Sequence, residues 1–238
     1  VAVLPTGSIE QHGRHLPTQT DSLLVEAVAK AGTAAFQGEA ETSRAVVAPT
    51  LWAGASDHHR SFFALSVSEG TYMDVVADLA ESLAEAGFTR LFVINGHGGN
   101  SAPLRVALSE LRRRVPSLVC AVADYWALAA PAFRAKRKSS AGGAAHAGEI
   151  ETSLMLHLSA ESVRSAEISA SVPAMPHGFE IDLIDGGPVS VYVPWESMSS
   201  DGQVGDPTVS DEESGKSFYE AAVSAFAEAL RRFAELSV

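Results

Sequence analysis

The stretch Leu4-Pro-Thr-Gly-Ser-Ile-Glu-Gln-His-Gly-Arg-His-Leu-Pro-Thr-Gln-Thr-Asp21 follows a short apolar run, Val1-Ala-Val-Leu4, that is typical of a buried strand. Glu10 and His12 are two residues apart, so on an extended backbone their side chains point the same way. Asp21 comes after a Pro-containing loop that can fold back toward them. Carboxylates and an imidazole that converge at the end of a strand are ligands for a divalent metal. A surface loop with scattered polar residues is the alternative, and these residues alone leave both interpretations open.

A second polar motif follows another apolar run. Leu91-Phe-Val-Ile94 indicates a buried strand, and Asn95-Gly-His-Gly-Gly-Asn100 comes directly after it. Its three glycines permit tight turns and close backbone approach, which presents His97 at the end of the strand. The alternative is an ordinary glycine-rich turn between a strand and a helix. Neither the G-x-G-x-x-G nor the G-x-x-x-x-G-K-[ST] pattern occurs here, which argues against a nucleotide site.

A third motif lies further along the chain. A loop of small residues, Gly142-Gly-Ala-Ala, precedes His146, and Glu149 and Glu151 then open an apolar pattern with helical period. An acid in the first turn of a helix is commonly a capping or dipole feature, and this explanation suits one glutamate. It accounts less well for two acids and a histidine beside a glycine-rich loop.

Strand-like and helix-like segments alternate along the chain. The alternation predicts a single three-layer α/β/α domain over residues 1–238, with a mostly parallel, mixed sheet covered by helices. Proteins with such a sheet bind their ligands at the carboxyl ends of the strands. The first two motifs follow Leu4 and Ile94, which end two expected strands, so both motifs are expected at that edge. We expect strands over 1–4, 45–48, 91–94, 118–123 and 189–193, and helices over 23–36, 72–86, 103–115, 149–158 and 213–235.

Composition narrows the possible partners. A net charge of -12 in 238 residues argues against nucleic acid and anionic membranes, because both would repel the protein. Cys120 is the single cysteine and lies in an apolar stretch, so a core position is favoured over a nucleophile. No apolar run reaches the length of a membrane span and no signal peptide is visible, which favours a cytoplasmic protein. The basic stretch 133–143 is interpreted as a plain surface loop, with a mobile lid or a subunit contact as alternatives.

Together the three motifs resemble the creatininase (creatinine amidohydrolase) family. Gly54-Ala-Ser-Asp-His-His59 and Gly205-Asp-Pro207 also match, and all five stretches occur in the family's order over nearly the whole chain. The resemblance is highly specific for the family and weakly specific for the substrate. Since family members usually carry residues before the first strand, we expect that an N-terminal segment is missing from this sequence.

The resemblance implies that five side chains hold one or two divalent ions. Four of the family's ligand positions are filled here by Glu10, His12, Asp21 and His97. The fifth, a glutamate two residues after the second motif's histidine, is replaced by Gly99, which counts against creatinine as the substrate. Glu151 is expected to supply the missing carboxylate, ahead of Glu149. Mixed imidazole and carboxylate ligands suit Zn, Mn or Fe.

The implied chemistry is hydrolysis of an amide or cyclic amide C–N bond. The metal would lower the pKa of a bound water toward neutrality, and His146, which matches the family's proton-shuttle histidine, would carry the proton to the leaving nitrogen. His58 and His59 are expected either to orient substrate or to support the ligands, with a hydrogen-bonded structural role for one of them as the alternative. Trp126 and Trp195 are expected in loops. Substrate contacts are expected from His59, Ser56, Trp126 and Trp195.

Three functions stay open. The first is a creatininase-like amidohydrolase acting on a small-molecule amide, which the stretch Tyr125–Ser140 ahead of His146 slightly favours. The second is a peptidase like the creatininase-family member of the mycofactocin system, which trims a precursor peptide and shares the Asn-Gly-His-Gly-Gly-Asn and His-Ala-Gly motifs. The third is a non-enzymatic metal-binding protein with the same fold, against which the full set of candidate ligands argues.

The resemblance also implies a homo-oligomer, most simply a hexamer built from dimers or trimers. Aromatic residues outside the expected core elements give this some independent support, because aromatics in loops often mark interfaces or pockets. The residues concerned are Phe62, Phe63, Tyr192 and Trp195.

Overall fold

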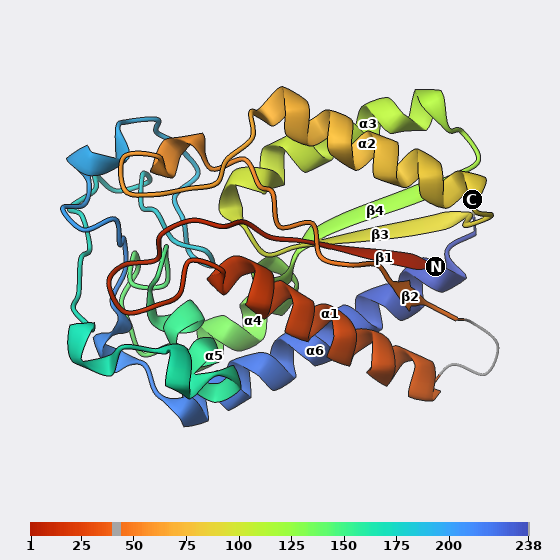
Figure 1. Cartoon of the computed structure of the whole chain (residues 1–238). Helices are drawn as coiled ribbons and strands as arrows, with labels where there is room; N and C mark the ends of the chain where they lie inside the picture. The colour runs from red at the N-terminus through yellow and green to blue at the C-terminus, as the bar shows by residue number, and fades with distance from the viewer. Residues whose placement is uncertain (40–43, 238) are drawn as a thin grey trace.

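The computed structural model describes residues 1–39 and 44–237. At its centre is a sheet with the strand order β2-β1-β3-β4 (Figure 1). Every neighbouring pair is parallel, so the expected parallel sheet is confirmed, whereas the mixed component is not found among the described strands. The strands are β1 (Ala2–Thr6), β2 (Val46–Val47), β3 (Arg90–Asn95) and β4 (Val119–Asp124).

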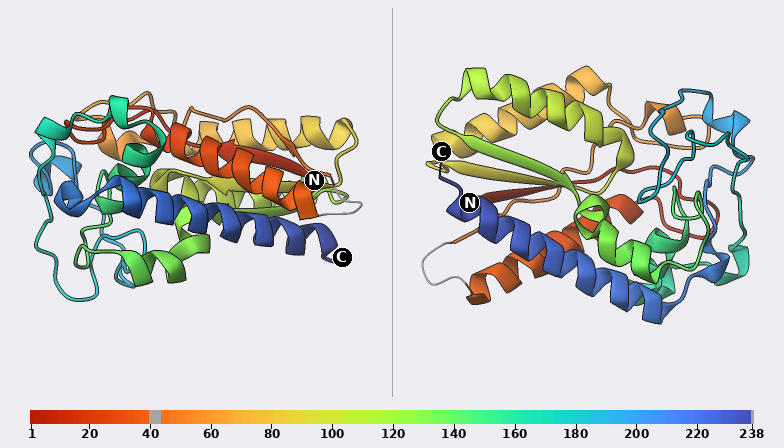
Figure 2. Two further views of the ribbon diagram at one scale, coloured as in Figure 1. Left: turned by 90° about the horizontal axis from the view of Figure 1, so that it is seen from below. Right: turned by 180° about the vertical axis from the view of Figure 1, so that it is seen from behind.

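Helices cover both faces of the sheet, which confirms the three layers (Figure 1). Phe92 and Ile94 of β3 point into a core with α1, α4, α5 and α6, whereas Leu91 and Val93 point into a second core with α2 and α3. Side chains alternate along a strand, so a strand buried on both faces needs a continuous apolar run. Figure 2 shows α6 running beside α1 along one face. The helices are α1 (Thr20–Glu39), α2 (Glu69–Glu85), α3 (Ser101–Arg114), α4 (Tyr125–Lys136), α5 (Glu149–Leu158) and α6 (Glu212–Glu235).

Local sequence signals set the limits of two helices. The Ser68 side chain accepts a hydrogen bond from the backbone N–H of Thr71 at the start of α2, and Gly87 follows its end with a φ of 93°. At the start of α6, Asp211 accepts from the backbone N–H of Ser214. The buried residues of α6 recur every three or four positions, as an amphipathic helix requires. They are Gly215, Phe218, Ala222, Phe226, Leu230 and Phe233.

Two expected elements are corrected by the structure. Residues 189–193 form no strand, although their side chains alternate in polarity. Glycines precede this segment, Pro194 follows it, and its Tyr192 is 93% exposed, so no neighbouring strand or core holds it extended. Trp126 lies in α4 rather than in a loop, because Trp126, Ala129 and Phe133 form a buried stripe with helical spacing.

Arg137 follows α4, and its guanidinium is buried against Asp182. The two guanidinium Nη atoms donate to the two Asp182 oxygens at 3.1 and 2.9 Å. Asp182 also accepts from the backbone N–H of Gly142 at 2.8 Å. A bidentate pair whose remaining acceptors are satisfied is the geometry in which a buried ion pair is favourable. The interpretation of 133–143 as a plain surface loop is therefore wrong, because the stretch begins in a helix and Arg137 anchors its second half.

Candidate metal centre

The predicted ligands come together at the carboxyl edge of the sheet. Glu10 and His12 lie in the loop after β1, and His97 follows β3, the parallel neighbour of β1. Asp21 and Glu151 stand in the first turns of α1 and α5. Since the carboxyl ends of parallel strands meet at one edge, residues far apart in sequence converge there. All five are at most 5% exposed.

Asp21 stands between the two histidines. Its Oδ1 lies 3.0 Å from His12 Nε2, and its Oδ2 lies 2.9 Å from His97 Nδ1. His97 Nδ1 is also 3.4 Å from Glu10 Oε1, and His12 Nε2 is 4.0 Å from Glu151 Oε2. The cluster therefore has two ends, one at Glu10 and His97 and the other at His12 and Glu151, with Asp21 shared.

The chemistry of these donors fits one or two divalent cations. Glu10 Oε2 is buried and has no hydrogen-bond donor among the described residues. Asp21 Oδ2 faces His97 Nδ1 in a geometry that is not a hydrogen bond. Buried carboxylate oxygens without donors are costly unless a cation binds them. Three sets of side chains have ligand atoms close enough to share one ion: Glu10, His58 and His97; Glu10, His12 and His146; and His12, Asp21 and Glu151.

The electrostatics of the cluster also favour bound positive charge. Burial raises the pKa of Glu10 above its usual range and the pKa of Glu151 to about 7. Burial alone would lower the histidine pKa values, but Asp21 raises the pKa of His12 to about 10 and Glu10 raises that of His97 to about 9. Burial would likewise raise the pKa of Asp21, yet the charge on His12 holds it well below its usual range. A divalent cation would supply the positive charge that these carboxylates attract.

His146 lies at the edge of the cluster with one nitrogen fixed. Its Nε2 is 2.8 Å from the backbone oxygen of Gln11, which can only accept, so Nε2 carries the hydrogen. The unprotonated Nδ1 then faces Glu10 Oε1 at 3.4 Å. Burial lowers the pKa of His146 well below its usual value, so the neutral ring is favoured. Of the two ring nitrogens of His146, Nδ1 is therefore the one at which a proton can be taken up and released.

Glu149, the second candidate for the missing carboxylate, lies outside the cluster. Its two oxygens accept from the backbone N–H groups of Lys138 and Ser139 at 2.7 and 2.8 Å. Glu149 therefore holds the chain after α4 in place. Glu151 instead faces the cluster. Its Oε2 accepts from the backbone N–H of Ala147 at 2.7 Å and lies 4.0 Å from His12 Nε2.

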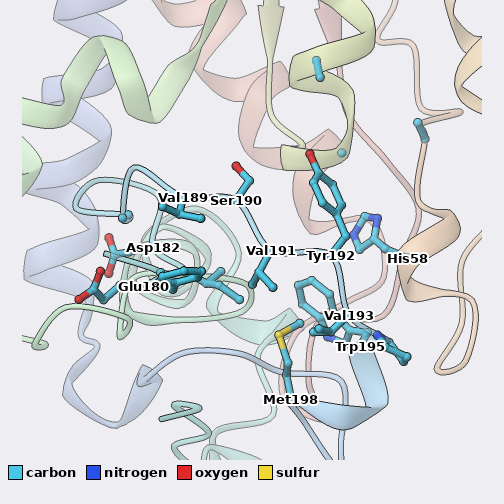
Figure 3. Close-up of a pocket in the computed structure, with 18 of the residues that line it drawn as sticks. His58, Glu180, Asp182, Val189, Ser190, Val191, Tyr192, Val193, Trp195 and Met198 are labelled. Carbon is cyan, nitrogen blue, oxygen red and sulfur yellow. The ribbon is translucent and has the colours of Figure 1, made fainter. Parts of the chain in front are cut away.

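One cavity lies at the cluster, and a second, larger one shares some of its lining residues. The smaller, about 260 Å³, is lined by Trp126 and Trp195 and by four of the five candidate ligands, Glu10, Asp21, His97 and Glu151. The larger, about 860 Å³, is lined mainly by the segment 179–195 and shares His58 and Trp195 with the smaller one. Figure 3 shows His58 and Asp182 on opposite sides of the larger cavity.

Ser56 and His59, which are expected to contact substrate, line neither of these two cavities. Both residues are fully buried. His59 Nε2 is 3.0 Å from the side-chain oxygen of Gln11, and the His59 ring packs 4.6 Å from the ring of His146. The two side chains instead contact His97 and His146, which line the smaller cavity, and the substrate contact expected of them stays a prediction.

Ser56 is hydrogen-bonded to a candidate ligand. Its Oγ lies 3.1 Å from His97 Nε2 and 2.5 Å from Ser8 Oγ. His97 Nε2 is also 3.2 Å from the backbone oxygen of Ala55, so Nε2 carries the hydrogen and Nδ1 faces the carboxylates. A histidine ligand is commonly oriented through its second nitrogen in this way. No sequence pattern indicates this contact, since Ser56 and His97 are 41 residues apart.

Replacing Ser56 by alanine is expected to weaken metal binding. The loss of the hydroxyl leaves the His97 ring less firmly oriented, so affinity should fall by about 10–100-fold. Titration against a chromogenic chelator measures this change directly. Ser82→Ala, which removes a surface hydroxyl on α2, is the matched control. Equal affinities for the Ser56 variant and the wild-type protein would show that the hydroxyl does not orient His97.

Gly99, at the position of the family's fifth ligand, has no room for a side chain. A Cβ at this position would lie 2.2 Å from the Ala55 oxygen and 2.6 Å from His97 Nε2. The side chain of Asn100 helps to set this close approach, because it accepts from the Ala55 N–H at 2.9 Å and donates to the Gly7 oxygen at 3.0 Å. The absence of a glutamate at residue 99 is therefore built into the backbone packing.

Gly99→Glu is expected to destabilise the protein rather than add a ligand. The backbone of Ala55 would have to move, and overpacking of this kind costs about 1–3 kcal/mol. Thermal denaturation together with metal analysis tests this. Gly70→Glu is the control, because a Cβ at Gly70 meets nothing within 4 Å. A Gly99→Glu protein with unchanged stability and tighter metal binding would contradict the steric argument.

Buried carboxylates and imidazoles at the carboxyl edge of an α/β sheet are donors for a divalent metal at the place where such folds bind their ligands. Comparison with known proteins gives the family. The family model described as creatininase, creatinine amidohydrolase, matches residues 1–230, and this chain belongs to that family.

Individual relatives differ in their activities. The chain is 33% identical to the mycofactocin precursor peptide peptidase of Mycolicibacterium smegmatis, over 98% of this chain and 85% of the relative. It is 28% identical to the creatinine amidohydrolase of Pseudomonas putida, over 97% of this chain and 88% of the relative. A solved mutant creatininase of Zn–Zn type superposes with a TM-score of 0.77 at 25% identity, covering 98% of this chain and 90% of that one.

Proposed function

We propose that this protein is a metal-dependent hydrolase that cleaves an amide C–N bond. The observation that carries the proposal is the convergence of Glu10, His12, Asp21, His97 and Glu151 in one buried cluster at a cavity. These residues would hold one or two divalent ions. A bound ion would supply an activated water and polarise the substrate carbonyl.

Side chains of the protein transfer the proton and shield the site from water. His146 Nε2 is fixed on Gln11, so Nδ1 is the atom that takes up a proton and passes it to the leaving nitrogen. The Trp195 ring packs 5.5 Å from the His146 ring at the cavity wall and shields it from bulk water. Ser8 and Ser56 do not act as nucleophiles in this mechanism, because their hydroxyls are buried against each other.

We propose a peptide as the substrate, ahead of a compact ring such as creatinine. The 33% identical relative is a precursor peptide peptidase. Beside the cavity at the cluster lies a space of about 860 Å³ that shares lining residues with it and is large enough for an extended ligand. The stretch Tyr125–Ser140 no longer favours a small molecule, because most of it is α4, which packs against α6.

A hydrolysis screen tests both parts of the proposal. The protein, loaded in turn with Zn, Mn and Fe(II), is incubated with short peptides, lactams including creatinine, and formamides, and the products are identified by mass spectrometry. Peptide cleavage that stops with a chelator and returns with metal is the expected result. Hydrolysis of lactams alone would overturn the peptide assignment. A metal-loaded protein that cleaves none of these substrates would favour the non-enzymatic alternative.

A further inference from the structure

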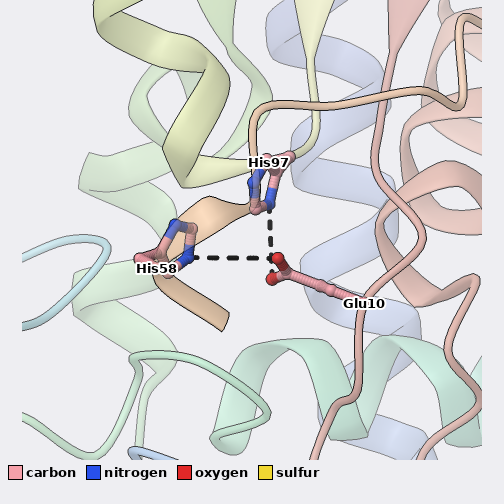
Figure 4. Close-up of side chains that lie close together, drawn as sticks. All are labelled: Glu10, His58 and His97. Atoms are coloured by element: carbon pink, nitrogen blue, oxygen red, sulfur yellow. Dashed lines mark ion pairs between the residues drawn. The ribbon is translucent and has the colours of Figure 1, made fainter. Parts of the chain in front are cut away.

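His58 lies at the boundary between the two cavities, beside the Glu10 end of the cluster. It belongs to the short 3-10 helix Asp57–His59, which follows the loop that carries Ala55. Its ring stacks on the ring of His97 with centroids 5.7 Å apart and an angle of 12° between the planes. Figure 4 shows that nitrogens of both rings face the Glu10 carboxylate.

The distances from Glu10 to His58 and His97 match those between two donor atoms that bind the same metal ion. His58 Nε2 is 3.9 Å from Glu10 Oε2, which is too long for a hydrogen bond. Two donors each about 2.1 Å from one ion stand roughly 3.4 Å apart at a tetrahedral angle and about 4.2 Å apart on opposite sides. Both the His58–Glu10 distance and the 3.4 Å between His97 Nδ1 and Glu10 Oε1 fall in this range.

An ion bound by both His58 and Glu10 would also explain why Glu10 Oε2 is buried without a hydrogen-bond donor among the described residues. This carboxylate oxygen has no hydrogen-bond partner in ranges 1–39 and 44–237 but has an imidazole nitrogen facing it. An ion between the two would bind both.

The close packing at Gly99 explains why residue 58, and not residue 99, offers a metal-binding side chain here. A Cβ at Gly99 would lie 3.1 Å from His58 Cε1, so the His58 ring occupies the space above residue 99. The family's ligand position at residue 99 therefore carries no donor in this chain, and an imidazole from another loop stands over it.

We propose that His58 is a ligand of the ion held by Glu10 and His97, an assignment that rests on the proposed metal-dependent function. His58 then closes this end of the centre on the side of the larger cavity. Glu151 serves the opposite end with His12, and Asp21 is shared between the two ends.

The test is metal binding to His58→Ala and His58→Glu. In competition titration with a chelator, His58→Ala is expected to lose at least about 10–100-fold in affinity for one ion, because one ligand is removed. With Co(II) as the probe, its visible absorption should change in both variants, since the bands depend on the number and type of ligands. His58→Glu should bind more tightly than His58→Ala, because glutamate is also a ligand. His177→Ala, which removes a fully exposed imidazole, is the matched control and should match the wild-type protein.

The outcomes separate the two proposals. If the wild-type protein binds no divalent ion, the proposed function fails and the His58 assignment fails with it. If the wild-type protein binds the ion and both His58 variants keep its affinity and its Co(II) spectrum, the His58 assignment alone is overturned. Circular dichroism identifies a variant that has lost its fold, and the second variant then decides the question.

Discussion

Asp21→Asn is expected to remove most of the activity and at least part of the bound metal. The substitution keeps the size of the side chain but removes the negative charge that His12 and His97 share. Because Asp21 would contact both ends of the centre, the loss affects any ion bound there. Metal ions contribute several kcal/mol of transition-state stabilisation, so kcat/KM should fall by about 10³-fold, or roughly 4 kcal/mol.

Metal analysis and steady-state kinetics on the cleaved substrate measure this effect. Asp74→Asn, a matched change at an exposed position on α2, should leave both unchanged. Full metal content in Asp21→Asn with undiminished kcat/KM would show that Asp21 is not a ligand, and the two-ended description of the cluster would then be wrong.

His146→Ala is expected to lower turnover by about 10²–10⁴-fold while metal content stays intact, because general acid–base catalysis typically contributes this much. The Nδ1 atom that faces the cluster disappears, whereas Glu10, His97 and Asp21 keep their contacts with one another. Added imidazole should restore part of the turnover, since the side chain is replaced by a space at the cavity wall.

His157→Gln is the control for this variant, because His157 lies at the far end of α5 and contacts the ring of Tyr219 instead. The competing explanation is that His146 is itself a ligand, since its Nδ1 lies close to ligand atoms of Glu10 and His12. Metal lost from His146→Ala would support that explanation and remove His146 from the proton pathway.

The sequence is enough to bring the predicted ligands together, but it does not reveal the contacts that Ser56 and His58 make with them. Glu10, His12 and Asp21 are close in sequence, and His97 follows a recognisable buried strand, so the rule for parallel sheets is enough to bring them together. Ser56 and His58 lie beside His97 through contacts that are distant in sequence, among them the close approach of Ala55 to Gly99 and the bond from Ala55 to Asn100. No periodicity or spacing reports such a contact.

The limits of the fold prediction have a similar origin. The helix over 125–136 escapes prediction although its buried stripe has helical spacing, because Pro131 lies within it. The alternation over 189–193 suggests a strand, but a strand needs a partner, and sequence alone does not show whether an edge is available.

The wall of the larger cavity has one part that is held in place and one part that tolerates change. The buried pair of Arg137 and Asp182 holds the first part. Asp182 is tied to the guanidinium and to several backbone N–H groups, while the nearby residues 189–193 are largely exposed and contribute little to either core. Substitutions in 189–193 should therefore alter which ligands fit without unfolding the protein. New substrate preferences could evolve, or be engineered, at that segment while the catalytic residues and the anchor stay unchanged.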